Sequence, residues 1–203
     1  MKNNKVQKMV SVSMFAAMGL VLQYVAIPIM PAFSFLKIDF SDIPVMLSMF
    51  LFGPAAGIST AFIRSFLHLI TTGLTPQNLV GDMASFLATL VFTYPVYLFF
   101  NKKNTMKNKV LGLVMGIIAM SVFMSLANYL VITPLYLKFF QISADQFLGM
   151  SLASYVMIGI LPFNLIKGTI VSGVFLVLHA KLLPWLQSKK NVSNPHIHTN
   201  LKN

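Results

Sequence analysis

The 203-residue sequence has no cysteine and only four acidic residues. Without cysteine it can form no disulfide framework, thiolate metal site or thiol nucleophile. So few acids leave little for catalysis by paired carboxylates. The motifs G-x-x-x-x-G-K-[ST] and H-E-x-x-H are also missing, so we expect no ATP-binding site, no metal site and no cofactor. The sequence therefore predicts a chain that is not an enzyme.

Apolar residues are abundant: they make up 57% of the chain against 9% charged residues, and the mean hydropathy is +0.78. Soluble domains carry about a quarter charged residues, so this composition indicates an integral membrane protein. The length suits about six spans of roughly 20 residues. We therefore predict an all-α bundle of six transmembrane helices, forming a single domain over residues 1–190 with a polar cytoplasmic tail at 191–203.

The expected spans cover residues 9–27, 44–52, 55–71, 79–100, 110–132 and 154–183. The long loop between the first two is apolar but rich in proline and aromatic residues, and such a segment at membrane depth must be covered by protein or line a cavity. We expect it to act as a lid. Within it, Asp42 is expected to cap the second helix ahead of Pro44, whereas Asp39 has no such role. Residues 133–150 are expected to include a short interfacial helix.

The basic residues fall mainly on one side of this topology, although the net charge of +11 could also suggest a nucleic-acid partner. That side collects Lys2, Lys5, Lys8, Lys102, Lys103, Lys107, Lys109, Lys181, Lys189 and Lys190. The opposite side has only Lys37 and Lys138. By the positive-inside rule, both termini are predicted to be cytoplasmic in a multi-pass protein of the plasma membrane, with the lid facing outward and no nucleic-acid partner.

Polar side chains inside the apolar spans are the candidates for function. Asn164 and Lys167 in "LPFNLIKG" are three residues apart and share a helix face, and Pro162 leaves a backbone carbonyl without its usual donor. Asn128 in "SLANYLV" lies at a comparable depth in the fifth span. Three donors converging under an aromatic lid favour a flat ligand with carbonyl and ring-nitrogen acceptors.

Structural alternatives exist for these residues. Asn128 is equally suited to holding two helices together, and Lys167 has a possible partner in Asp82. We favour a ligand for Lys167, because the acids look too few and too peripheral to build an internal ion-pair network. Arg64 has no evident partner, which leaves snorkelling, a lipid headgroup or a partner protein open. His68 is expected to make an ordinary hydrogen bond in the bundle or at the interface.

Five segments, in this order and spacing, resemble the riboflavin-specific substrate-binding component (S component) of energy-coupling factor (ECF) vitamin transporters: "KIDFSDIP", "FGPAAGI", "GDMASFLA", "LANY" and "LPFNLIKG". The resemblance covers residues 10–181. It implies a six-helix bundle that captures riboflavin from outside with high affinity. It also implies association with a membrane coupling subunit and two cytoplasmic ATPases, riboflavin being the transported ligand.

The resemblance further implies that the asparagines and the lysine contact the flavin and that the first aspartate of "DFSD" lies near its ribityl chain. The predicted ligand-binding set is Asp39, Phe40, Asn128, Tyr129, Asn164 and Lys167. Ser85 stands where relatives often carry asparagine, so no contact is assigned there. Small residues of the first helix dock the coupling subunit in this family, and their counterparts here are Ser13, Ala16, Ala17 and Gly19; packing within the bundle is the alternative.

Three functional classes compete with this interpretation. An S component for a different vitamin is the nearest, and a flavin nucleotide is a related ligand because Lys37 near the lid could meet a phosphate. A self-sufficient secondary transporter would work without partners, but no internal repeat is visible in the sequence. A lipid-modifying enzyme would need an acid–base pair that the spans do not supply.

Overall fold

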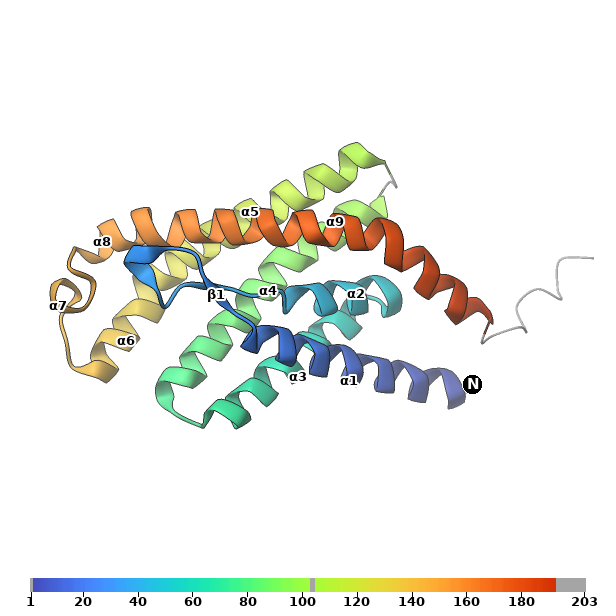
Figure 1. Cartoon of the computed structure of the whole chain (residues 1–203), viewed down its shortest axis with the longest axis horizontal. Helices are drawn as coiled ribbons and strands as arrows, with labels where there is room; N and C mark the ends of the chain where they lie inside the picture. The colour runs from blue at the N-terminus through green and yellow to red at the C-terminus, as the bar shows by residue number, and fades with distance from the viewer. Residues whose placement is uncertain (1, 103–104, 193–203) are drawn as a thin grey trace, which may run out of the picture.

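The computed structural model describes residues 2–102 and 105–192, and this part of the chain is a bundle of long helices (Figure 1). The main helices are α1 (Lys2–Tyr24), α2 (Asp42–Phe52), α3 (Pro54–Thr72), α4 (Pro76–Lys102), α5 (Met106–Ala127) and α9 (Leu161–Val192). Short segments link them, namely the π-helical turns η2 (Asn128–Ile132) and η3 (Val156–Ile160) and the helices α6 (Thr133–Phe140), α7 (Ala144–Leu148) and α8 (Leu152–Tyr155).

Four helical segments in the described part of the chain are long and apolar enough to cross a membrane: Lys5–Tyr24, Pro76–Lys102, Met106–Phe140 and Leu152–Lys181. The all-α membrane class is thereby confirmed, while the count of six spans stays a prediction. The fifth and sixth helices are longer than expected because α5 continues through η2 into α6, and α8 continues through η3 into α9. Residues 133–150 are expected to include a short interfacial helix; in the structure residues 133–140 extend the fifth helix, and α7 is a separate short helix.

The shortest of the main helices, α2, lies at the centre of the bundle, with every residue from Asp42 to Met49 buried. It packs against α1, α3, α4 and α9. Gly53 adopts a φ of 92°, a conformation that glycine tolerates best, and so lets the chain reverse directly into Pro54 at the start of α3. This tight turn keeps α2 and α3 side by side.

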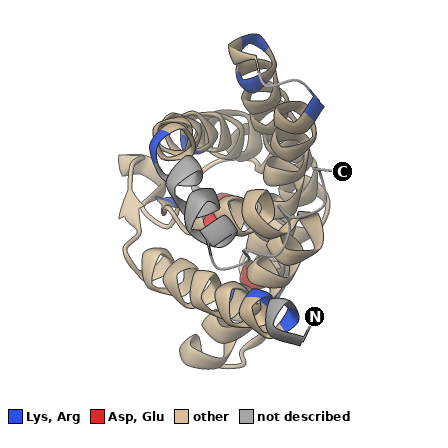
Figure 2. Ribbon diagram, turned by 90° about the vertical axis from the view of Figure 1, so that its right-hand side faces the viewer, with Lys and Arg blue, Asp and Glu red and all other residues tan. Residues whose placement is uncertain are grey.

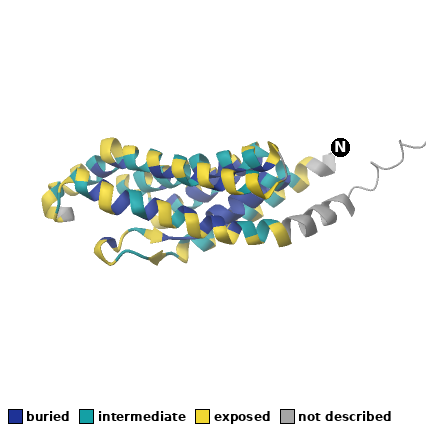
Figure 3. Cartoon of the chain, turned by 90° about the horizontal axis from the view of Figure 1, so that it is seen from above, coloured by how far each residue is buried: buried dark blue, intermediate teal, exposed yellow. Residues whose placement is uncertain are grey.

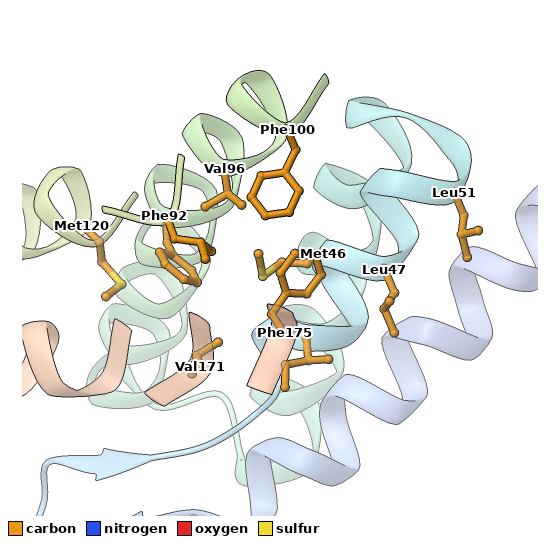
Figure 4. Close-up of a cluster of buried hydrophobic side chains, with 11 residues drawn as sticks. Met46, Leu47, Leu51, Phe92, Val96, Phe100, Met120, Val171 and Phe175 are labelled. Atoms are coloured by element: carbon orange, nitrogen blue, oxygen red, sulfur yellow. The ribbon is translucent and has the colours of Figure 1, made fainter. Parts of the chain in front are cut away.

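Apolar side chains from α2, α4, α5 and α9 fill the interior between these helices (Figure 4). The labelled members of this core are Met46, Leu47, Leu51, Phe92, Val96, Phe100, Met120, Val171 and Phe175. Buried residues follow the inward faces of the helices, and exposed residues follow the outward faces (Figure 3). Many of those exposed residues are large and apolar, as expected for surfaces that meet lipid rather than water.

The segment between α1 and α2, which we predict to be a long apolar loop, forms a small β-hairpin in the structure. Strands β1 (Ile27–Pro28) and β2 (Lys37–Ile38) pair antiparallel, and the 3-10 turn η1 (Pro31–Phe33) lies between them. The Phe33 ring is 5% exposed and meets the Tyr155 ring edge-on, with 5.3 Å between centroids. Because of this contact, the hairpin lies along the end of the bundle formed by α8 and the start of α9 (Figure 1).

Figure 2 views the bundle from the end that carries the N-terminus, and lysines stand at the helix ends there. Lys5, Lys102 and Lys107 are exposed at this end. The predicted tail at 191–203 lies outside the described residues, apart from the last two residues of α9.

Candidate functional site

A cavity of about 470 Å³ lies between the hairpin, α4, the η2–α6 segment and the η3–α9 segment. Most of its wall is aromatic or aliphatic, with Phe35 and Leu36 contributed by the hairpin. Polar groups enter it from Ser85, Asn128, Thr133, Tyr136 and Asn164. A mainly apolar cavity of this size with a few convergent polar groups is typical of a small-molecule site.

Two π-helical turns shape the far wall of this cavity. The backbone N–H of Thr133 bonds to the carbonyl of Asn128, and that of Leu161 bonds to the carbonyl of Val156, so each closes a turn of five residues. A proline follows each closing residue and cannot donate a helical hydrogen bond, which favours the local change in winding. Such turns are frequent at functional sites.

The two asparagines sit beside these turns, and backbone bonds hold both. The Nδ2 of Asn128 donates to the carbonyl of Met124 at 2.8 Å, and its Oδ1 accepts from the Thr133 hydroxyl at 3.2 Å. The Nδ2 of Asn164 donates to the carbonyl of Ile160 at 2.8 Å. Both residues are buried and line the cavity, so two of the three predicted donors lie together.

Lys167, the third predicted donor, is held by a carboxylate. Its Nζ donates to Asp39 Oδ2 at 3.0 Å and lies 4.0 Å from Asp42 Oδ2. Asp39 also accepts from the backbone N–H of Ser41 at 2.9 Å and from the Ser41 hydroxyl. Burial raises the pKa of Asp39, but the Lys167 ammonium and the Ser41 bonds outweigh it and hold the pKa at about 2.

The prediction that Arg64 lacks a partner is wrong. Its guanidinium is fully buried, with Nη1 3.2 Å from Asp42 Oδ1 and 2.8 Å from the Ser41 hydroxyl. Its Nη2 donates to the hydroxyls of Thr89 at 2.9 Å and Ser85 at 3.3 Å. We call these five residues the arginine cluster. These acceptors pair both Nη atoms, while Nε has no hydrogen-bond partner among the described residues. A buried arginine needs such acceptors, because unpaired buried charge is very costly.

Two further predictions about the acidic residues are wrong. Asp42 does not cap α2: the helix begins at Asp42, Ser41 is in the capping position, and the Asp42 carboxylate is turned to Arg64 and Thr89. The acids are not peripheral either, since Asp39 and Asp42 form the internal ion-pair network that we considered unavailable. They come from a loop in the sequence, but the central position of α2 carries them into the bundle.

Asp82, the alternative partner of Lys167, is paired with a different residue. Its Oδ1 lies 2.7 Å from Nδ1 of His68, and the His68 ring also packs against the Tyr24 ring at 5.4 Å between centroids. His68 thus makes the hydrogen bond within the bundle that we expected. Asp82 is on the side of α4 that faces α3, while its neighbour Gly81 lines the cavity.

The other predicted residues lie away from the cavity wall. Tyr129 is 47% exposed on the outside of the bundle, and Phe40 packs against the apolar core. The predicted docking set divides: Ser13 and Ala17 are exposed, whereas Ala16 and Gly19 are buried. A Cβ at Gly19 would lie 3.1 Å from Arg64 Cδ, so this glycine lets α1 approach the arginine cluster.

Sequence reasoning missed Thr133, Tyr136 and Tyr155 as cavity residues. Thr133 and Tyr136 are three residues apart and share a helix face, but both lie outside the predicted spans, in the segment expected to include a short interfacial helix. Tyr155 is the second residue of the expected sixth span, 154–183, at its outer end. Threonine and tyrosine near the end of a membrane span are found at membrane interfaces as well as on cavity walls, so the sequence alone does not assign them to the cavity.

A family model, "ECF transporter, substrate-specific component", matches residues 7–179, which is most of the chain. The chain belongs to this family. Its helical bundle is similar to the solved structure described as "Structure and mechanism of the S component of a bacterial ECF transporter", with a TM-score of 0.74 and 32% identity, covering 90% of this chain and 98% of that one.

Curated proteins similar to this S component are named as transporters of one vitamin. It is 37% identical to the riboflavin transporter FmnP of Bacillus subtilis, over 96% of this chain and 100% of that protein. It is 35% identical to the riboflavin transporter RibU of Streptococcus thermophilus, over 87% of this chain and 82% of that protein. The RibU protein of Staphylococcus aureus is also 35% identical, over 92% and 95% of the two chains. The family is a transporter component, so the S component is not classed with enzymes.

Proposed function

We propose that this S component binds riboflavin outside the cell and releases it inward as the binding subunit of an ECF transporter. The observation that carries the proposal is its identity, over nearly the whole chain, to several proteins named riboflavin transporters. The cavity supports it physically, because a flat apolar ring system with an acceptor-rich edge suits aromatic walls and amide donors.

The ligand-binding set in this proposal includes Asn128 and Asn164 on the cavity wall, and the ion-paired Lys167 and Asp39, which are not lining residues of the cavity. Asp39 is at the end of the hairpin, so the ion pair joins the lid to α9. Phe40 and Tyr129 follow Asp39 and Asn128 directly in the sequence and remain in the proposed set on that ground, although neither lines the cavity. Phe40 would act by packing against the apolar core. Riboflavin is cargo here and not a cofactor.

The proposed topology has six membrane spans, with both termini in the cytoplasm and the hairpin facing outward. Lysines at the end that carries the N-terminus support this orientation. Since the sequence has no phosphate-binding loop, energy would come from two cytoplasmic ATPases acting through a membrane coupling subunit. Ser13 and Ala17 are the outward-facing members of the proposed docking surface.

The test is a riboflavin titration of the purified protein in detergent, followed by quenching of flavin fluorescence. Tight saturable quenching at one flavin per chain is the expected result, with competition by flavin nucleotides and unrelated vitamins as the specificity control. Saturation by another vitamin alone would contradict the choice of ligand. Uptake into proteoliposomes without the ATPases and coupling subunit would instead favour a self-sufficient transporter.

A further inference from the structure

Three hydroxyl groups surround the buried guanidinium of Arg64. They belong to Ser41, Ser85 and Thr89, and each accepts a hydrogen bond from an Nη atom, at 2.8 Å, 3.3 Å and 2.9 Å. A hydroxyl carries one hydrogen and two lone pairs, so each of the three still has its own hydrogen to donate. The three residues differ in the acceptor to which each hydroxyl donates this hydrogen.

Two of the hydroxyls donate to carboxylates. Ser41 donates to Asp39 Oδ1, and Thr89 donates to Asp42 Oδ1 at 2.6 Å. Each therefore forms a chain from a cationic donor, through a hydroxyl, to an anionic acceptor. Such chains strengthen their members, because the charge at each end polarises the hydroxyl between them.

Ser85 is the hydroxyl without a protein acceptor among the described residues, and it is also the one that lines the cavity. Serine and threonine in helices commonly donate to the carbonyl four residues back, as Thr60 and Thr169 do here. Ser85 makes no such bond to Gly81. Its hydrogen can therefore point into the cavity while its oxygen is held by Arg64.

We propose that Ser85 is a ligand-binding residue whose hydroxyl, oriented by Arg64, donates a hydrogen bond to an acceptor atom of the bound ligand. The proposal rests on the proposed function, under which that acceptor is a ring carbonyl oxygen or ring nitrogen of riboflavin. It gives this chain its own donor at a position to which the sequence alone assigned no contact.

The charges around the cluster favour a neutral acceptor. Arg64 is paired with Asp42, and Lys167 is paired with Asp39, so the two cations are balanced by two carboxylates. What reaches the cavity is a polarised hydroxyl and not an excess positive charge. A carbonyl or ring nitrogen suits such a donor, whereas a phosphate group would require unbalanced cations.

The test compares riboflavin affinity in wild-type protein and Ser85→Ala by fluorescence quenching. Loss of a buried hydrogen bond with a polarised donor should weaken binding by roughly tenfold. Ser172→Ala is the control, because it also removes a helical serine hydroxyl and Ser172 is buried on α9 away from the cavity wall. Its riboflavin affinity should stay within about threefold of wild type, the range of an ordinary neutral substitution.

Thr89→Val separates the donor from a general effect on the arginine cluster. It removes the other hydroxyl on the same Nη2 without changing the cavity wall, so it should lower the melting temperature but weaken binding less than Ser85→Ala. Equal affinity losses in both variants, or unchanged affinity in Ser85→Ala, would overturn the assignment of Ser85 alone. A wild-type protein that binds no riboflavin would overturn the proposed function as well.

Discussion

Lys167 and Asp39 are separated by 128 positions in the sequence, yet their charged groups lie 3.0 Å apart inside the bundle. Removing both charges from water is costly, and only close pairing with additional hydrogen bonds offsets that cost. Ser41 supplies those bonds to Asp39, and Asp42 lies near the lysine from the other side. The pair therefore depends on both partners, and losing either one leaves an uncompensated buried charge.

This dependence predicts different effects of single and double substitutions on stability and binding. Lys167→Ala should destabilise the ligand-free protein by about 3 kcal/mol, because Asp39 loses its counter-ion. It should also weaken riboflavin binding by more than about 1.5 kcal/mol if the amine contacts ligand. Thermal unfolding and fluorescence quenching measure the two effects.

The double variant Lys167→Met with Asp39→Asn serves as the control, since it removes both charges together. It should recover most of the lost stability but not the affinity. Recovery of both would mean that Lys167 acts on the ligand only through the fold, and that its place in the ligand-binding set is wrong.

The low pKa of Asp39 predicts a loss of stability in acid. The carboxyl has a pKa of about 2 in the folded chain against 3.8 when unperturbed, so its ion pair stabilises the fold above pH 3.8 and this contribution disappears as the pH falls toward 2. The contribution is roughly 2 kcal/mol. Melting temperatures from pH 6 to pH 3 should fall more steeply in wild type than in Asp39→Asn, and parallel curves would contradict the assignment.

For single residues, the sequence identified the costly buried cations, but it did not identify the carboxylates that pair with them. The cost of burying Lys167 and Arg64 in apolar helices was evident from their positions alone. Their partners were not, because Asp39 and Asp42 follow a proline-rich loop that reads as exposed. Only the three-dimensional position of α2 shows that this loop ends inside the bundle.

The hairpin between α1 and α2 is the element that covers the cavity. Phe33 contacts the Tyr155 ring at the end of α8. It also faces Gly159 in η3, where a Cβ would lie 3.1 Å from the Phe33 ring. Asp39 fastens the other end of the hairpin through Lys167. A lid held at two points, one apolar and one ionic, should slow the release of whatever occupies the cavity.

Phe33→Ala should therefore speed riboflavin dissociation by roughly tenfold or more, since replacing a buried phenylalanine by alanine removes about 3 kcal/mol of packing. Stopped-flow displacement of bound riboflavin measures this rate. Phe62→Ala is the matched control because Phe62 is 57% exposed on α3, away from the cavity. Equal rates in both variants would show that the hairpin does not limit release.

Helices were predicted best where proline or glycine marks their ends in the sequence. Helices at 44–52, 55–71 and 79–100 were placed within three residues, because proline and glycine mark their ends. The π turns could not be predicted, since Pro134 and Pro162 in helical patterns indicate either an end or a change in winding. The predicted fifth span ends at residue 132, before Pro134, and this boundary leaves Thr133 and Tyr136 outside the predicted site.

At the scale of the whole molecule, two opposite faces of α1 have different neighbours. Gly19 and Ala16 face inward, where Gly19 leaves room for the aliphatic part of Arg64. Ser13 and Ala17 are four residues apart and exposed, next to the exposed Met14 and Met18. Small residues at this spacing allow another helix to approach closely in a membrane. The inward face serves the fold, and the outward face is available to the proposed coupling subunit.

Enlarging one residue on each face separates the two roles. Ala17→Leu adds bulk where no described part of the chain lies, so riboflavin affinity should be unchanged while uptake with the full transporter falls by about tenfold through weaker helix docking. Gly19→Leu should lower both stability and binding, because its side chain would displace Arg64 from the cluster that also holds Ser85 and, through Ser41, Asp39. Uptake into proteoliposomes and fluorescence quenching give the two readouts. If Ala17→Leu lowered affinity and uptake together, the outward face of α1 would belong to the binding bundle and the docking surface would have to lie elsewhere.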